Sequence, residues 1–496
     1  MAETIVRTLE PLHWQDVAAI ANGAVLKLSG DVWGRLAYAR AIVEGLIRRR
    51  IRGYGINTGV GALSDVIINE EHQQALSRNI IMSHACAVGE PFGIAETRAI
   101  MVAQINNFAH GASGIRPEVV DLLLHMLEFD CIPLIPSKGS VGYICHSASI
   151  GQVLIGSGSA ICRGEKLPGG EALARIGRSP IVLQAKEGMN LVNGTPCATG
   201  LACLVLHKIN GLLDWADAAA AMTYENLGAQ SDAFADGTIA FRTSPGLRVV
   251  GRHLRQLLQG SAYLAARIGS RTQDPLSLRG IPQVHGAARD AFDDAARTVD
   301  RELASMTDNP AVGGTPEAPE VYSHAHAIGA SLAQAMDSLG AAAASLGGIS
   351  SQRIERLINP HLSSLPAFLA DGSGVRSGYM IAQYAATSLV AENRRLAAPA
   401  IIDGGTTSAL QEDILTHATP AATKALAIAA NVELILSIEL LTAAQAYECQ
   451  SGAGDKAPKT EVLYRRLRAR VAPYRDDRPM NDDFEAIRSL IASEAA

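Results

Sequence analysis

Long alanine-rich stretches are the feature that most constrains how this chain can fold. Four of them, near 199–225, 325–346, 379–398 and 420–447, carry apolar residues at helical spacing and contain few glycines or prolines. Alanine and leucine favour helices, whereas aromatic residues make up only 4% of the chain. The sequence predicts a mainly α-helical protein, with an N-terminal mixed lobe over 1–198 followed by a long central helical bundle and C-terminal surface helices over 199–496.

Charge and cysteine patterns exclude several classes of partner. The 43 basic and 49 acidic residues give a net charge of −6 with no dense basic block, so we expect no nucleic-acid partner. Glu433 and Glu439 interrupt the apolar run at 425–446, and the N-terminus does not resemble a secretory signal, which favours a cytoplasmic protein outside the membrane. Seven scattered cysteines and histidines without ligand spacing predict reduced thiols and no metal site.

Loops rich in Gly, Asn, Thr and Asp separate the predicted helices, and chemistry is expected there. The first contains Tyr54, followed by Gly-Ile-Asn-Thr-Gly-Val-Gly. A tyrosine in such a loop could act as a base if positive charge or hydrogen bonds lowered its pKa. The simpler interpretation is a tyrosine that closes a turn through a local hydrogen bond. Taken alone, the residue favours the simpler interpretation.

The Tyr54 loop and several later segments resemble, in order, those of the histidine and aromatic amino acid ammonia-lyase family. The resemblance covers roughly Gly53–Glu448 and implies an ammonia-lyase/fumarase-like fold. It also implies a homotetramer in which loops of different subunits meet at one active site, and a small amino acid or related carboxylate as substrate. The matching segments are Glu187–Thr195, Gln273–Arg279, Thr307–Pro310, Ser377–Met380, Glu392-Asn393 and Gln411–Asp413.

The resemblance assigns roles to matching residues. Tyr54 would remove a β-proton, Arg279 would hold the α-carboxylate through a bidentate fork, and Asn193 would bond the reacting amino group or the cofactor. In histidine-selective members the Ser-His pair and an acid lie near the substrate ring, which favours a polar ring over phenyl here. A helix histidine bonded to backbone is the alternative for His84. The substrate-binding set is Ser83, His84, Gln273 and Glu412.

The match breaks where these lyases form their methylidene-imidazolone electrophile from an Ala-Ser-Gly triplet. The flanking residues match, but three residues are missing after Gly142, and Ala148-Ser149-Ile150 is no substitute because isoleucine stands in place of glycine. Ala112-Ser113-Gly114 matches a different family segment, and we interpret it as a turn. The region that would carry the cofactor therefore consists of Gly142, Tyr143, Cys145 and His146.

Two further positions depart from the family. Leu276 stands where a second active-site tyrosine is expected, and the Gly-Asn-Phe-His segment reads Ala325-His326-Ala327-Ile328. Three hypotheses follow. The chain is an ammonia-lyase or aminomutase that acts on histidine or an aromatic L-amino acid, with an omitted or otherwise formed electrophile, the lyase reaction giving ammonia and the 2,3-unsaturated acid. It is an electrophile-free enzyme that eliminates or isomerises a different carboxylate substrate. Or it is a catalytically silent binding or scaffold homologue. Retention of Tyr54, Asn193 and Arg279 argues against the third.

Overall fold

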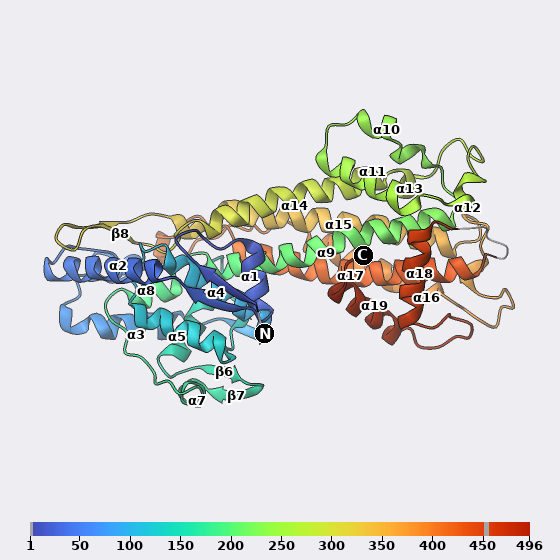
Figure 1. Ribbon diagram of the computed structural model, residues 1–496. Helices are drawn as coiled ribbons and strands as arrows, with labels where there is room; N and C mark the ends of the chain where they lie inside the picture. The colour runs from blue at the N-terminus through green and yellow to red at the C-terminus, as the bar shows by residue number, and fades with distance from the viewer. Residues whose placement is uncertain (1–2, 451–455) are drawn as a thin grey trace. The chain divides into compact units, whose positions relative to one another are not determined.

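A computed structural model describes residues 3–450 and 456–496. Packing divides the described residues into two compact units: unit 1 comprises 3–207, 295–337 and 399–423, and unit 2 comprises 208–294, 338–398, 424–450 and 456–496. Each unit is built from segments far apart in the sequence, as the colours of Figure 1 show. The mainly helical class predicted from the sequence is confirmed, whereas the boundary expected at residue 198 stays a prediction.

Unit 1 mixes helices with short strands. The strands form a parallel pair (β1 with β2), two antiparallel pairs (β3 with β5, β8 with β9) and an antiparallel three-stranded sheet in the order β4-β6-β7. Its strands are β1 Thr4–Arg7, β2 Val25–Leu28, β3 Val88–Pro91, β4 Cys131–Pro133, β5 Pro136–Lys138, β6 Ser159–Cys162, β7 Glu165–Pro168, β8 Ala311–Gly314 and β9 Pro319–Tyr322. Its helices are α1 Trp14–Ala21, α2 Gly30–Arg48, η1 Gly61–Leu63, η2 Glu70–His72, α3 Gln73–His84, α4 Ile94–Ala109, α5 Pro117–Glu128, α6 Cys145–Leu154, α7 Gly169–Arg175, α8 Glu187–Val192, η4 His326–Ile328 and η6 Ser408–Leu410.

Within the described residues, unit 2 is helical, and four long helices supply residues to both units. The four are α9 Pro196–Asn226, α14 Ile281–Leu303, α15 Ala330–Ile358 and α17 Ala418–Glu448. Unit 2 adds η3 Ser231–Phe234, α10 Asp236–Ala240, α11 Pro245–Leu258, α12 Ala262–Ala265, α13 Leu276–Arg279, η5 Ala367–Leu369, α16 Met380–Leu396, α18 Pro458–Arg470 and α19 Asn481–Ser493.

Small side chains allow the long helices to pack closely. A Cβ at Gly200 of α9 would lie 2.6 Å from the backbone of Ala99 in α4, so only glycine permits this approach. Residues 187–226 and 418–448 are apolar enough to cross a membrane by length and composition. Their most apolar windows are 94% and 72% buried inside the protein, which is typical of core helices.

Candidate active site

A cavity of about 640 Å³ in unit 1 gathers polar side chains from segments spread over the sequence. It is formed by the loop after α2, the residue after Gly142, the end of α8 and the loops that precede η4 and follow η6. Tyr54, Asn193 and Glu412, which the sequence singled out for separate roles, all line this cavity. The lining residues are Arg52, Tyr54, Thr58, Ser64, Asp65, Tyr143, Asn193, Asn309, Ser323, His324, Ala325, Ala327, Ile328, Gln411, Glu412, Asp413 and Ile414.

Glycines shape the loop that presents Tyr54. Gly61 has φ +58°, and a Cβ there would lie 2.4 Å from Ser408 Oγ, so glycine lets η6 approach. The Gly61 N–H donates to Tyr54 Oη over 2.9 Å. Burial raises the pKa of Tyr54, the Gly61 bond lowers it, and the charge of Glu412 raises it further. The hydroxyl is thus bonded locally, as the simpler interpretation expects, and its pKa is raised, whereas a base would benefit from a lowered one.

Glu412 is the common electrostatic neighbour of several groups around the cavity. Thr407 Oγ1 donates to Glu412 Oε2 over 2.8 Å and holds the carboxylate in place. The pKa of Tyr143 is raised first by burial and then by Glu412, which accepts a hydrogen bond from the Tyr143 phenol. Burial lowers the pKa of His84, although a backbone bond at Ile80 and Glu412 raise it. At neutral pH Tyr143 is therefore a neutral phenol.

His84 and Ser83 close α3 and are not among the described residues that line the cavity. Ser83 Oγ lies 3.0 Å from His84 Nδ1, so the two side chains form a hydrogen-bonded pair. Asn193 does line the cavity: its Nδ2 donates to the Asn309 carbonyl over 3.3 Å, and its Oδ1 accepts from the Gly194 N–H over 2.7 Å. Its amide is thereby held in one orientation.

The loop before α6 does not fit the formation of a methylidene-imidazolone. Gly142 is followed directly by Tyr143, whose side chain lines the cavity. The Gly142 N–H donates to Ser140 Oγ over 3.1 Å, and the Gly142 carbonyl accepts from Thr419 Oγ1 over 3.1 Å. Gly142 has φ +128°, and a Cβ there would meet the Ala418 nitrogen at 3.1 Å. Its peptide groups are used in packing, and no Ala-Ser-Gly precursor follows it.

The Ala112-Ser113-Gly114 triplet is part of a buried polar network and is not among the described residues of the cavity. Ser113 is fully buried; its Oγ donates to Asp308 Oδ1 over 2.6 Å, and its carbonyl accepts from Lys186 Nζ over 2.6 Å. The Ala112 carbonyl accepts from the Val312 N–H over 2.8 Å. These bonds engage the Ala112 carbonyl and the Ser113 hydroxyl, two of the groups that a cyclisation would have to use.

Cys145 and His146 open α6 and are also absent from the described lining. His146 is buried against Phe92, and its Nδ1 lies 3.4 Å from Cys197 Sγ. Burial lowers the pKa of His146 to about 4, with a backbone bond at Ser137 opposing the change. His146 is thus a neutral packing residue at neutral pH.

Gln273 and Arg279 lie together in unit 2. Arg279 Nε donates to the Asp274 carbonyl over 2.9 Å, and with the Gln273 amide oxygen facing the guanidinium, Nη1 donates to it over 3.0 Å. Leu276 is 67% exposed. The structure therefore places the expected carboxylate-binding residues and the Tyr54 cavity in different compact units.

His324 and Asn309 line the cavity although the sequence reasoning gave them no role. The His324 ring stacks on that of His326 at 3.9 Å, and its backbone N–H donates to Asn309 Oδ1 over 2.8 Å. Both residues could have been found from the sequence. Asn309 belongs to Thr307–Pro310, which resembles a family segment, and His324 directly precedes Ala325–Ile328, where the sequence differs from the family.

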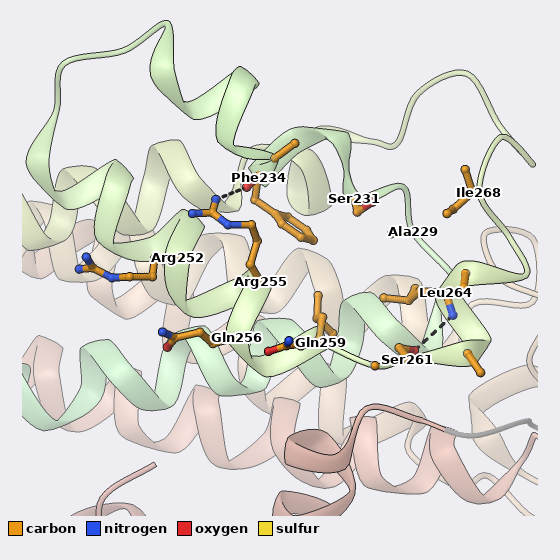
Figure 2. A pocket seen from close by; sticks show the side chains of 15 residues that line it. Ala229, Ser231, Phe234, Arg252, Arg255, Gln256, Gln259, Ser261, Leu264 and Ile268 are labelled. Atoms are coloured by element: carbon orange, nitrogen blue, oxygen red, sulfur yellow. Dashed lines mark hydrogen bonds between the residues drawn. The ribbon is translucent and has the colours of Figure 1, made fainter.

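A second cavity, of about 750 Å³, lies in unit 2 between η3, α11 and α12 (Figure 2). Its lining includes the apolar residues Phe234, Leu258 and Leu264. Of its two arginines, Arg255 is paired with Asp236 and the Phe234 carbonyl, as Figure 2 shows for the carbonyl. No acid, histidine, cysteine or tyrosine belongs to its described lining, so general acid–base chemistry is better served by the unit 1 cavity.

Comparison with known proteins finds relatives that match nearly the whole chain. Residues 12–469 match the family described as aromatic amino acid lyase. A histidine ammonia-lyase of Symbiobacterium thermophilum is 46% identical, over 96% of this chain and 94% of that protein. The crystal structure of histidine ammonia-lyase from Trypanosoma cruzi has a TM-score of 0.91 at 32% identity and covers 99% of this chain and 93% of its own. The ergothioneine-degrading enzyme of Treponema denticola has a TM-score of 0.91 at 26% identity, covering 99% of each chain. The chain therefore belongs to the aromatic amino acid lyase family.

Proposed function

We propose that this carbon-nitrogen lyase acts on L-histidine or a histidine-derived amino acid, releasing ammonia or an amine and the 2,3-unsaturated acid. The observation that carries the proposal is the gathering of Tyr54, Asn193 and Glu412 around one cavity. The names of the relatives support histidine as the first substrate to test.

Each group has a role in this proposal. The Tyr54 phenolate removes the β-proton, and Glu412 with the Ser83–His84 pair binds the imidazole ring. Asn193 donates to the amine-bearing end of the substrate. In the proposed tetramer, Arg279 of another subunit, steadied by Gln273, binds the α-carboxylate.

Ammonia is the first candidate for the leaving group, because the histidine ammonia-lyase relatives cover nearly the whole chain. Elimination of ammonia is chemically difficult without an electrophile, since the β-proton is weakly acidic. The loop after Gly142 offers no precursor for one.

A quaternary ammonium is the second candidate, favoured by the raised pKa of Tyr54. A phenolate then forms only at alkaline pH, where a primary α-ammonium loses its proton and becomes a poor leaving group. A trimethylammonium cannot lose a proton and leaves as neutral trimethylamine. Its charge also suits a cavity with Glu412, Asp413 and two tyrosine rings. The similarity to an ergothioneine-degrading enzyme is consistent with this choice.

Parallel assays of L-histidine and its Nα,Nα,Nα-trimethyl derivative test the proposal. We expect ultraviolet absorbance of the conjugated acid to rise with at least one of them, with release of ammonia or trimethylamine identifying the leaving group. The intact mass should equal that of the printed sequence, and borohydride should leave turnover unchanged. A β-amino acid product would indicate an aminomutase instead, and ligand binding without turnover would indicate a silent homologue.

We also propose a cytoplasmic homotetramer. Large apolar side chains remain exposed in the single chain, among them Phe241 at 89%, Val375 at 87% and Ile402 at 77%, and assembly would cover such groups. Light scattering coupled to gel filtration measures the state directly; a monomeric mass at micromolar concentration would contradict this part of the proposal.

A further inference from the structure

Two thiols of unit 1 lie close together beside the cavity. Cys86 Sγ and Cys145 Sγ are 3.4 Å apart, although the residues are separated by 59 positions in the sequence. Cys86 is exposed and Cys145 is half-buried. Neither residue has a role in the proposed elimination, and no disulfide is present between them.

Well-fixed backbone holds both sulfurs in place. Cys86 follows α3, and its N–H donates to the His84 carbonyl over 2.9 Å. Directly after it, β3 pairs with β5, and a Cβ at Gly139 would lie 3.4 Å from the Ala87 Cα. Cys145 begins α6 after Ile144, a β-branched residue at φ +80°, where the backbone is strained. The short distance between the thiols is therefore set by anchored segments rather than by free loops.

We propose that Cys86 and Cys145 form a reversible disulfide when the protein meets a hydroperoxide. The exposed Cys86 thiol is oxidised first to the sulfenic acid, while the peroxide is reduced to water or an alcohol. The Cys145 sulfur then attacks the Cys86 sulfur, the S–O bond breaks, and the Cys145 proton leaves with the hydroxide as water. Formation of the bond requires the sulfurs to approach from 3.4 Å to about 2.05 Å.

The order of these steps follows from the surroundings of the thiols. Burial, together with the neighbouring Cys86 and Glu412, raises the pKa of Cys145 to about 12. A half-buried thiol with so little thiolate reacts slowly with peroxide, so the exposed Cys86 is oxidised first. Oxidation of Cys86 removes the thiol hydrogen bond and charge through which Cys86 raises the pKa of Cys145, which favours the second step. Cys145 lies close enough to act as the resolving thiol.

Disulfide formation would act on the candidate active site from two sides. Cys86 follows His84 by two residues, and Cys145 follows Tyr143 by two. The charge of Glu412 acts on His84, Tyr143 and Cys145 alike, so the new bond joins segments that surround this carboxylate. We expect the disulfide to restrain both segments and to lower turnover.

A second thiol pair of unit 1 provides a matched control. Cys131 of β4 and Cys162 of β6 are directly opposed across the antiparallel sheet, and both are fully buried. Peroxide has no direct access to them. If closeness of the two sulfurs were sufficient, peroxide would oxidise both pairs. If one thiol must also be exposed to solvent, peroxide will oxidise only Cys86 and Cys145.

Intact mass and peptide mapping of the full-length protein before and after hydrogen peroxide test the proposal. We expect the loss of two hydrogens, a peptide pair linking Cys86 to Cys145, and reversal by dithiothreitol. Cys86→Ser and Cys145→Ser should each abolish the link, and Cys131→Ser should keep it. A wild-type protein whose Cys86 is oxidised without the link, or a link through Cys131, would overturn the proposal.

Activity provides a second measurement that separates this inference from the proposed function. With whichever substrate turns over, peroxide should reduce wild-type turnover at least fivefold, while Cys86→Ser should keep its basal rate under the same treatment. An equal loss in both proteins would contradict the effect on the active site. Because the peptide map needs no substrate, failure of the proposed function would leave the thiol chemistry fully testable.

Discussion

The unit 1 cavity and the polar core of unit 2 use charged groups in opposite ways. In unit 2, Arg353 and Glu439 are fully buried and bonded over 2.6 and 2.8 Å, and Thr223 and Ser350 donate to the same carboxylate. In unit 1, Glu412 accepts from the Thr407 hydroxyl of its own loop and from the Tyr143 phenol, and its charge acts on phenols that line an open cavity. A carboxylate that is fully occupied by an arginine and hydroxyl donors, as Glu439 is, is typical of a structural role. Phenols whose pKa is shifted by a carboxylate with fewer partners, as around Glu412, are typical of a reactive site.

Asp217, another buried carboxylate of unit 2, makes the same point. Burial would raise the pKa of Asp217, but bonds from His253 and His285 and the charge of Arg289 hold it well below its usual range. Asp214, Asp217 and His253 offer ligand atoms close enough for a metal ion. Arg289 already pairs with both aspartates at 2.7 and 2.6 Å, so we interpret this cluster as a structural charge network.

Tyr54→Phe is expected to have the largest effect. Removal of the phenol oxygen deletes the proposed base, so kcat/KM should fall about 10²- to 10⁴-fold. The melting temperature should hardly change, because the oxygen's protein partner is the Gly61 N–H. Steady-state kinetics and thermal unfolding of the same preparation measure both. Tyr38→Phe, at a half-exposed position of α2, is the matched control; equal kinetics in the two variants would remove Tyr54 from the mechanism.

Glu439→Gln should affect stability rather than chemistry. The change leaves the buried Arg353 charge without its counter-ion, which costs about 3 to 5 kcal/mol of unfolding free energy. Denaturant unfolding measures it. Thr223 and Ser350 can still bond the amide, so the shape of the core is retained. A loss below about 1 kcal/mol, as for a surface pair, would end the distinction drawn between the two regions.

The contrast between apolar and charged segments explains which helices could be predicted from the sequence. The apolar run near 420–447 became α17 over Ala418–Glu448, and 199–225 became α9 over Pro196–Asn226. The helix predicted over 325–346 was partly wrong. Gly329 has φ +59°, so α15 begins only at Ala330, and it continues to Ile358. Helix α14 was not among the predicted helices, because the prediction rested on alanine-rich apolar runs, whereas α14 carries many charged residues opposite its apolar face.

The candidate site was predictable only through resemblance. Tyr54, Asn193 and Glu412 are far apart in the sequence, and no periodicity places them around one cavity. His324 was missed because a single histidine in a loop carries no local signal. The raised pKa of Tyr54 could not be predicted either, since it depends on burial and on a carboxylate 358 positions away.

Glu412→Gln sharpens the comparison through pH. The Glu412 charge raises the pKa of Tyr54, so its removal should lower that pKa. The base must be deprotonated to act, and the rising limb of log kcat/KM against pH should therefore move to lower pH. KM should rise at the same time, because the proposed ring contact is weakened. An unmoved limb with a raised KM would mean that Glu412 binds substrate without influencing Tyr54.

Glu461→Gln is expected to have the smallest effect. Glu461 pairs with Arg465 one turn along α18, where the two side chains are 38% and 73% exposed. Exposed pairs of this kind contribute about 0.3 to 0.5 kcal/mol, since solvent screens the charges. Added salt should reduce even this difference, whereas the cost of Glu439→Gln should persist in salt because both groups of that pair are buried. Denaturant unfolding of the two variants at low and high salt therefore distinguishes an ion pair that stabilises the core from an ion pair on the surface. A loss of more than about 1 kcal/mol of unfolding free energy in Glu461→Gln would contradict this ranking.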